Sequence, residues 1–151
     1  MKKIIFSLIA SVMVSLSASA FTFDGINITG NVQNVMREIA AKGYVFNEEN
    51  NWLEGNCQGT VINISFNLTD VKTSGKIGQM LINVPIQGGA DAVATAFKNA
   101  QTIFNVVYHA YKSGTPNSYV ADADGTTMLL TQTPTGLRLT YNTPYYKKQN
   151  Q

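Results

Sequence analysis

Residues 30–43, GNVQNVMREIAAKG, place their hydrophobic side chains at helical spacing. The apolar positions are Val32, Val35, Met36, Ile39 and Ala40. Spacings of three and four put these residues on one face of an α-helix. Thr29 or Asn31 can cap the start of this helix, while Lys42 and Gly43 supply the charge and the stop typical of a C-terminus. The segment is therefore predicted to be a short amphipathic helix lying on a core.

After Gly43 the period of the pattern shortens to two, which is typical of strands. Short apolar segments flank the acidic, turn-forming stretch 47–51, so that stretch is predicted to be a hairpin loop. In the segment TVINISFNLTD (60–70), Ile62, Ile64, Phe66 and Leu68 alternate with Asn63, Ser65 and Asn67. In the segment QMLINVP (79–85), Met80, Ile82 and Val84 alternate in the same way. These segments predict a meander of about four antiparallel strands with one buried and one solvated face.

Gly88 and Gly89 end the meander, and the sequence from residue 90 returns to helical spacing. The apolar positions are Val93, Ala96, Phe97, Ala100, Ile103, Phe104, Val107 and Tyr111. This spacing predicts a second, longer helix, which Gly114 and Pro116 would terminate.

Three further strands are predicted at 118–121, 126–131 and 136–141, and the tail 145–151 is expected to be frayed. The order is thus helix, strands, helix, strands. We expect one α+β domain over 21–144, built from two units in which a helix precedes antiparallel strands, with the helices on one face of the sheet.

Residues 1–20 have the three regions of a secretory signal peptide. Lys2 and Lys3 precede the apolar run 4–16, which serines interrupt and which is shorter than the roughly 20 residues of a membrane span. Cleavage after Ala20 would leave Phe21 first rather than the cysteine of a lipoprotein. The mature chain is therefore expected in the periplasm or outside the cell, without a lipid anchor.

Removal of Lys2 and Lys3 with the signal peptide would leave nine basic and nine acidic residues. A neutral chain lacks the basic surface that nucleic-acid binding requires. Polarity comes mainly from Asn, Gln, Thr and Ser, which predicts an uncharged solvated surface.

Several turns and helix ends resemble those of small exported Bacteroidetes proteins whose fold is like that of the β-lactamase-inhibitor-protein and PepSY groups. The matching stretches are AAKGYVF, LEGNCQG, MLINVP, YKSGTP and GTTMLLTQTPTGLRLTYN. The resemblance covers most of the mature chain and implies a sheet face that can bind another protein. It assigns no contact residue here.

Cys57 is the only cysteine and His109 the only histidine. Together they could form a thiol catalytic pair if the second helix crossed the second strand. A structural thiol is the simpler interpretation, because the sequence indicates no third residue that would orient the histidine. Glu48, Glu49 and Glu54 could include the two carboxylates of a hydrolase, but their place on or beside a loop favours a solvated hairpin tip. The sequence indicates no metal site and no cofactor.

The leading hypothesis is therefore a non-enzymatic binding module that uses the exposed face of its sheet. The candidate contact residues are Trp52, Asn63, Ser65, Asn67 and Arg138. The partner would be a protein or peptide of the cell envelope. Two alternatives stay open: a thiol-dependent or other hydrolase using Cys57 with His109, and a structural component that self-associates through sheet edges.

Overall fold

The computed structural model describes residues 22–23, 26–28, 31–57, 59–68, 75–107, 109–110, 117–120 and 126–149. The helices are α2 (Val32–Ala41), α3 (Ala90–Val107) and α4 (Pro144–Gln149). The strands are β1 (Thr22–Phe23), β2 (Ile26–Asn27), β3 (Val45–Asn47), β4 (Trp52–Cys57), β5 (Thr60–Leu68), β6 (Ile77–Pro85), β7 (His109–Ala110), β8 (Ser118–Val120), β9 (Thr127–Thr133) and β10 (Gly136–Asn142). The predicted signal peptide, 1–20, lies outside the described residues.

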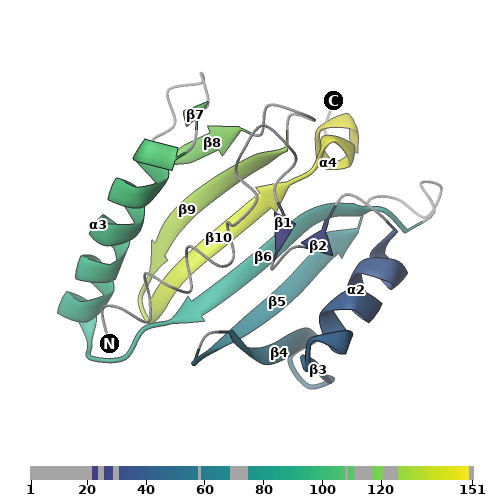
Figure 1. Ribbon diagram of the computed structural model, residues 1–151, viewed down its shortest axis with the longest axis horizontal. Helices are drawn as coiled ribbons and strands as arrows, with labels where there is room; N and C mark the ends of the chain where they lie inside the picture. The colour runs from purple at the N-terminus through teal and green to yellow at the C-terminus, as the bar shows by residue number, and fades with distance from the viewer. Residues whose placement is uncertain are drawn as a thin grey trace.

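An antiparallel sheet of eight strands in the order β3-β4-β5-β6-β10-β9-β8-β7 forms the centre of the protein (Figure 1). Strands β1 and β2 pair separately as a small hairpin. The predicted α+β class with an antiparallel sheet is confirmed. Strands β3 to β6 follow one another in space as in sequence, and so do β7 to β10. The two series meet where β6 pairs with β10, with Asn83 opposite Arg138.

Helix α2 begins and ends at residues that the sequence singled out. The Asn31 side chain accepts a hydrogen bond of 2.8 Å from the backbone N–H of Gln33, so Asn31 rather than Thr29 forms the N-cap. At the other end Gly43 has a φ of 100°, which glycine adopts without the steric cost other residues carry. Its N–H donates to the Ala40 carbonyl at 2.9 Å.

Helix α3 is shorter than its hydrophobic pattern predicted. It ends at Val107, and His109 belongs to the short strand β7 rather than to the last turn of the helix. Thr102, Ile103 and Val107 are β-branched, and this residue type lowers helix propensity and favours strands. Hydrophobic spacing alone could not distinguish a last helical turn from the start of a strand. The predicted stops at Gly114 and Pro116 lie outside the described residues.

The C-terminal segment also differs from expectation, because residues 145–149 of the expected frayed tail belong to α4, which begins at Pro144. The buried Thr143 precedes this helix, and its hydroxyl donates to the carbonyls of Ile77 and Gly78 at 2.6 and 3.2 Å. Pro144 occupies the first helical position, where its missing N–H costs nothing. The tail is therefore attached to the start of β6.

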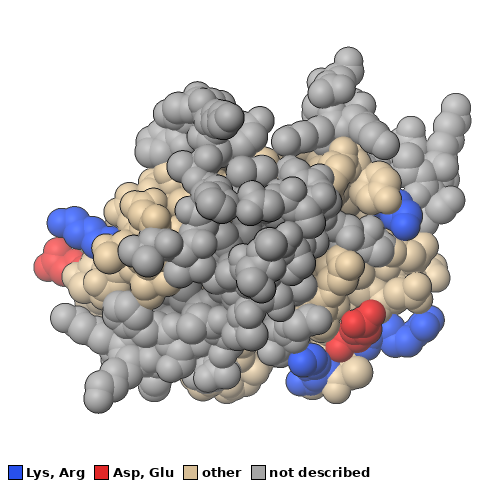
Figure 2. Space-filling model, turned by 45° about the horizontal axis from the view of Figure 1, so that its top comes forward, with Lys and Arg blue, Asp and Glu red and all other residues tan. Residues whose placement is uncertain are grey.

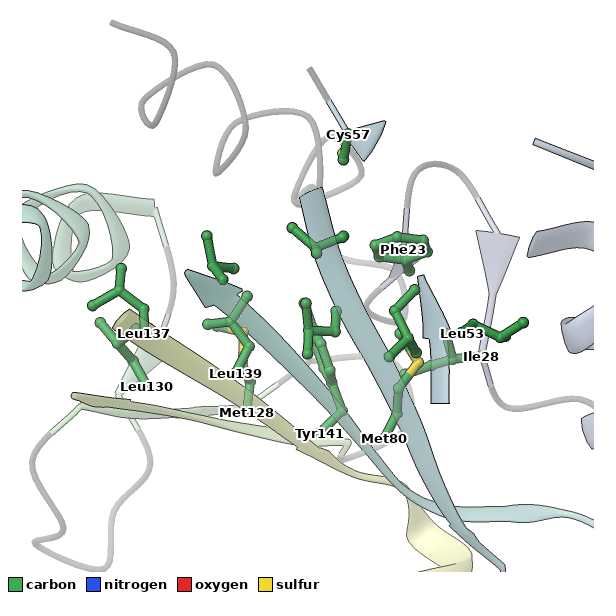
Figure 3. Packing of buried hydrophobic residues seen from close by; sticks show 14 of the residues in the cluster. Phe23, Ile28, Leu53, Cys57, Met80, Met128, Leu130, Leu137, Leu139 and Tyr141 are labelled. Atoms are coloured by element: carbon green, nitrogen blue, oxygen red, sulfur yellow. The ribbon is translucent and has the colours of Figure 1, made fainter. Parts of the chain in front are cut away.

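One face of the sheet, which we call the inner face, packs into a single hydrophobic cluster with α2 and α3. Figure 3 shows Met80, Leu139 and Tyr141 projecting from neighbouring strands to the same side. The helices contribute side chains such as Val35 and Phe104 to this cluster. The inner face is thus the one predicted to be buried.

The inner-face cluster includes two edge-to-face aromatic pairs, one near β3 and one near β8. Phe23 and Tyr44 have ring centroids 5.8 Å apart, and Phe104 and Tyr119 have theirs 5.7 Å apart. The Tyr119 hydroxyl donates to the Asn105 side chain at 2.7 Å, which satisfies a polar group inside an apolar layer.

Candidate binding surface

The opposite side of the same strands, which we call the outer face, is polar and almost free of charge. Its positions are Trp52, Glu54, Asn56, Val61, Asn63, Ser65, Asn67, Gln79, Leu81, Asn83, Leu129, Thr131, Arg138, Thr140 and Asn142. At these positions of β4, β5, β6, β9 and β10 the only charged residues are Glu54 and Arg138. The predicted solvated face and its uncharged character are both present in the structure.

A row of hydrogen-bonded amides crosses three central strands of the outer face. Asn67 on β5 donates to Gln79 on β6 at 2.7 Å, and Gln79 donates to Asn142 on β10 at 2.8 Å. An amide group carries both donors and an acceptor, so such a row satisfies itself without any charge. The row fixes three side chains in defined orientations on the surface.

The Arg138 side chain is held in a similar way two rows along, beyond the row that contains Leu81 and Thr140. Its Nε donates to the Asn83 side-chain oxygen at 2.8 Å, while the residue as a whole is exposed. Within the described part of the chain, neither terminal guanidinium nitrogen has a hydrogen-bond partner. Arg138 therefore presents the two nitrogens that bind a carboxylate in the bidentate geometry, on a side chain already oriented by Asn83.

Glu54 forms the second charged point of the outer face, on β4. Its Oε1 accepts from the indole N–H of Trp52 at 2.5 Å and from the Asn47 amide at 3.0 Å. Glu54 therefore lies on the sheet, beside the turn 48–51 rather than at its tip, because the strand begins at Trp52. Its second carboxylate oxygen has no partner within the described residues.

The register of the sheet places both charged residues in one line across the strands. Glu54 stands opposite Asn63, Asn63 opposite Asn83, and Asn83 opposite Arg138. Three strand spacings separate the two ends, or about 14 Å. An anionic and a cationic group thus lie at the two ends of a row whose middle is two neutral amides. We call this the charge row.

All five residues predicted as contacts stand on the outer face, although on three different strands. Asn63 and Arg138 belong to the charge row, Asn67 belongs to the amide row, and Trp52 bonds to Glu54. Sequence reasoning did not identify the side chains that these residues contact, which are Gln79 for Asn67, Asn83 for Arg138 and Glu54 for Trp52. The alternation in QMLINVP pointed to two of these, but the pairing of β6 with β10 could not be read from it.

Cys57 and His109 are far apart in the structure. Cys57 is only 5% exposed and lies at the end of β4. His109 lies on β7, six strand positions away, which corresponds to about 29 Å along the sheet. The strand order therefore offers no support for a thiol and imidazole pair. Among the described residues no group of three or more His, Cys, Asp or Glu side chains could hold a metal ion.

Most other charged groups of the described residues stand on the helices or in turns. Figure 2 shows those of the described residues toward the left and right margins of its view. Helix α2 carries Arg37 and Glu38, with Lys42 at its end, and α3 carries Asp91 and Lys98, all of them exposed. In the described segments, no helix is long and apolar enough to cross a membrane.

Comparison with protein-family models, curated proteins and solved structures gives no match to this chain.

Proposed function

We propose that the protein is an exported, non-enzymatic interaction module whose contact surface is the outer face of its sheet. The fold proposed for it is two units of one helix and four strands, as in the β-lactamase-inhibitor-protein and PepSY groups. Export would follow from the signal peptide at 1–20. The partner proposed is a protein or peptide of the cell envelope rather than a nucleic acid.

The observation that carries this proposal is the pre-oriented polar surface. Asn67, Gln79 and Asn142 hold one another in place, and Asn83 holds Arg138. Side chains fixed before binding lose little conformational entropy when a partner arrives. Amides that are already aligned can offer their remaining donors and acceptors at a fixed spacing.

The shape of the surface favours a macromolecular partner. Small-molecule sites are usually concave and mostly apolar, whereas the outer face is a broad sheet surface dominated by amides and hydroxyls. Five strands of about seven residues cover on the order of 600 Å², close to one side of a standard protein interface. A flat polar partner surface fits it best.

The test is a capture experiment with tagged protein lacking residues 1–20, in envelope extracts of the source cell. The variant Gln79→Ala/Asn142→Ala removes the amide row, and Gln33→Ala/Asn34→Ala changes the same residue types on the exposed side of α2. We expect a component identified by mass spectrometry to be retained by the wild type and the helix variant, and lost with the sheet variant.

Binding of the purified component should then be measured by calorimetry, with at least a tenfold weaker association for the sheet variant. Equal retention by all three proteins, or no retained component at all, would count against the outer face as the contact surface.

A further inference from the structure

The charge row allows the partner to be specified further, in a step that rests on the outer face being the contact surface. We infer that the outer face binds a second copy of this chain, forming a two-fold symmetric dimer. Across the strands, the charge row has the order Glu54, Asn63, Asn83 and Arg138. Read from the opposite end, the row runs from a cation through two amides to an anion.

Two such rows are complementary when stacked face to face about a two-fold axis parallel to the strands. An axis placed over the line between β5 and β6 brings Glu54 of each copy opposite Arg138 of the other. It also brings Asn63 opposite Asn83, so the two amides can exchange hydrogen bonds. The terminal nitrogens of Arg138 and the second oxygen of Glu54 are the groups this pairing would use.

The alternative axis, perpendicular to the strands, is excluded by charge. It would place Glu54 opposite Glu54 and Arg138 opposite Arg138, and like charges that face each other in an interface oppose association. The positions of two residues therefore select one orientation of the dimer. Both axes keep the strands of the two sheets aligned, which is one of the two common ways in which sheets stack, so charge alone decides between them.

Leu81 gives the dimer an apolar centre. It lies on β6, opposite Ser65 on β5 and Thr140 on β10, and its side chain is half-buried. Because β6 is next to the proposed axis, the two Leu81 side chains would lie about one strand spacing apart and contact each other. Each Leu81 side chain would bury the apolar surface that stays exposed to water in the isolated chain.

Size and net charge both permit the association. Two faces of on the order of 600 Å² give about 1,200 Å² in total, the lower limit of stable specific interfaces. Nine basic and nine acidic residues remain after removal of residues 1–20, so two copies carry no net repulsion. The predicted complex is a reversible dimer of modest affinity.

The experiment uses charge reversal in the protein lacking residues 1–20. Sedimentation velocity from about 1 µM to about 1 mM should show a reversible monomer–dimer equilibrium for the wild type. Arg138→Glu alone, or Glu54→Lys alone, should weaken the dimer at least tenfold, because each puts two pairs of like charges in the interface. A 1:1 mixture of the two single variants should recover a dimer, since their charges complement each other.

The double variant Glu54→Lys/Arg138→Glu should likewise dimerise, which a surface made for a different protein would not do. Circular dichroism and thermal unfolding establish that each variant is folded. Leu81→Asp provides a second disruption that leaves the hydrogen bonds of Glu54 intact. Fluorescence of the only tryptophan, Trp52, should change on dilution of the wild type and stay constant for Arg138→Glu.

A wild type that stays monomeric to about 1 mM would overturn the inference. So would a dimer that the single reversals leave unchanged. The dimer and the proposed function can fail independently. If a monomeric protein still captures a component through Gln79 and Asn142, the outer face remains the contact surface and only the dimer is contradicted. A dimer with the predicted reversal pattern that captures nothing else would make the second copy the sole partner.

Discussion

The two faces of the sheet are built from the same strands but have opposite chemistry. On β6 the successive residues Met80, Leu81, Ile82 and Asn83 alternate between the fully buried inner face and the half-buried outer face. The inner residues are held by exclusion from water, which is strong and undirected. The outer amides are held by hydrogen bonds, which are individually weak but fix direction. Under the proposed function, stability and recognition would thus depend on different sides of one backbone.

The largest expected effect comes from truncating neighbouring residues on opposite faces. Ile82→Ala should lower the free energy of unfolding by about 2–5 kcal/mol, because it leaves a cavity in the inner cluster. Leu81→Ala should lower it by less than about 1 kcal/mol in dilute solution, because Leu81 is half-buried and borders solvent. Urea denaturation followed by circular dichroism measures both. Equal losses would mean that the outer face contributes to the core.

Two glycine substitutions test whether the packing on each face of the sheet can accommodate an added Cβ atom. A Cβ at Gly136 would overlap the backbone carbonyl of Val84, and a Cβ at Gly55 would overlap the ring of Tyr44. Each Gly→Ala change should cost about 1–3 kcal/mol of unfolding free energy. In a Tyr44→Ala background the cost at Gly55 should disappear, whereas the cost at Gly136 should remain. Unfolding measurements on the two double-mutant cycles give this result, and additivity at Gly55 would contradict the contact.

Alkaline pH tests the inner face through its buried phenols, because burial raises the pKa of both Tyr119 and Tyr141. Burial raises the pKa of Tyr141, which is fully enclosed, above its ordinary value of about 10. Above pH 10 the unfolded chain releases this proton while the native state retains it, so stability falls as pH rises, by about 1.4 kcal/mol per pH unit. Below pH 10 both states are protonated and nothing changes. Thermal unfolding between pH 8 and pH 12 should show a shallower decline for Tyr141→Phe, and identical slopes would refute the assignment.

The smallest effects are expected in the amide row. Gln79→Ala removes two hydrogen bonds and should cost about 1 kcal/mol, whereas Asn67→Ala removes one and should cost about half as much. Both values are near the precision of urea denaturation, so replicate curves at matched protein concentration are needed. A loss above about 3 kcal/mol at Gln79 would show that the row also supports the fold.

The sequence predicted what depends on neighbours along the chain. Alternation revealed the strands and their two faces, and Asn31 and Gly43 revealed the ends of α2. The sequence pattern could not predict the features that depend on contacts between distant segments. Helix α4 forms on a polar tail because Thr143 bonds to carbonyls 66 and 65 residues away. The charge row exists only because β6 pairs with β10, and no local pattern encodes that pairing.

The pairing of β6 with β10 also has a consequence for how the chain folds. Each series of four strands can grow from hairpins between consecutive strands, but the central seam joins side chains such as Gln79 and Asn142, 63 residues apart. Closing such a long loop costs entropy before any contact forms, and folding rates fall as contacts become less local. The seam should therefore close last, after both edges of the sheet exist. The middle of the sheet would then be the last part of the native structure to form. The hydrogen bond between Gln79 and Asn142, which crosses it, would form only once β6 and β10 are aligned.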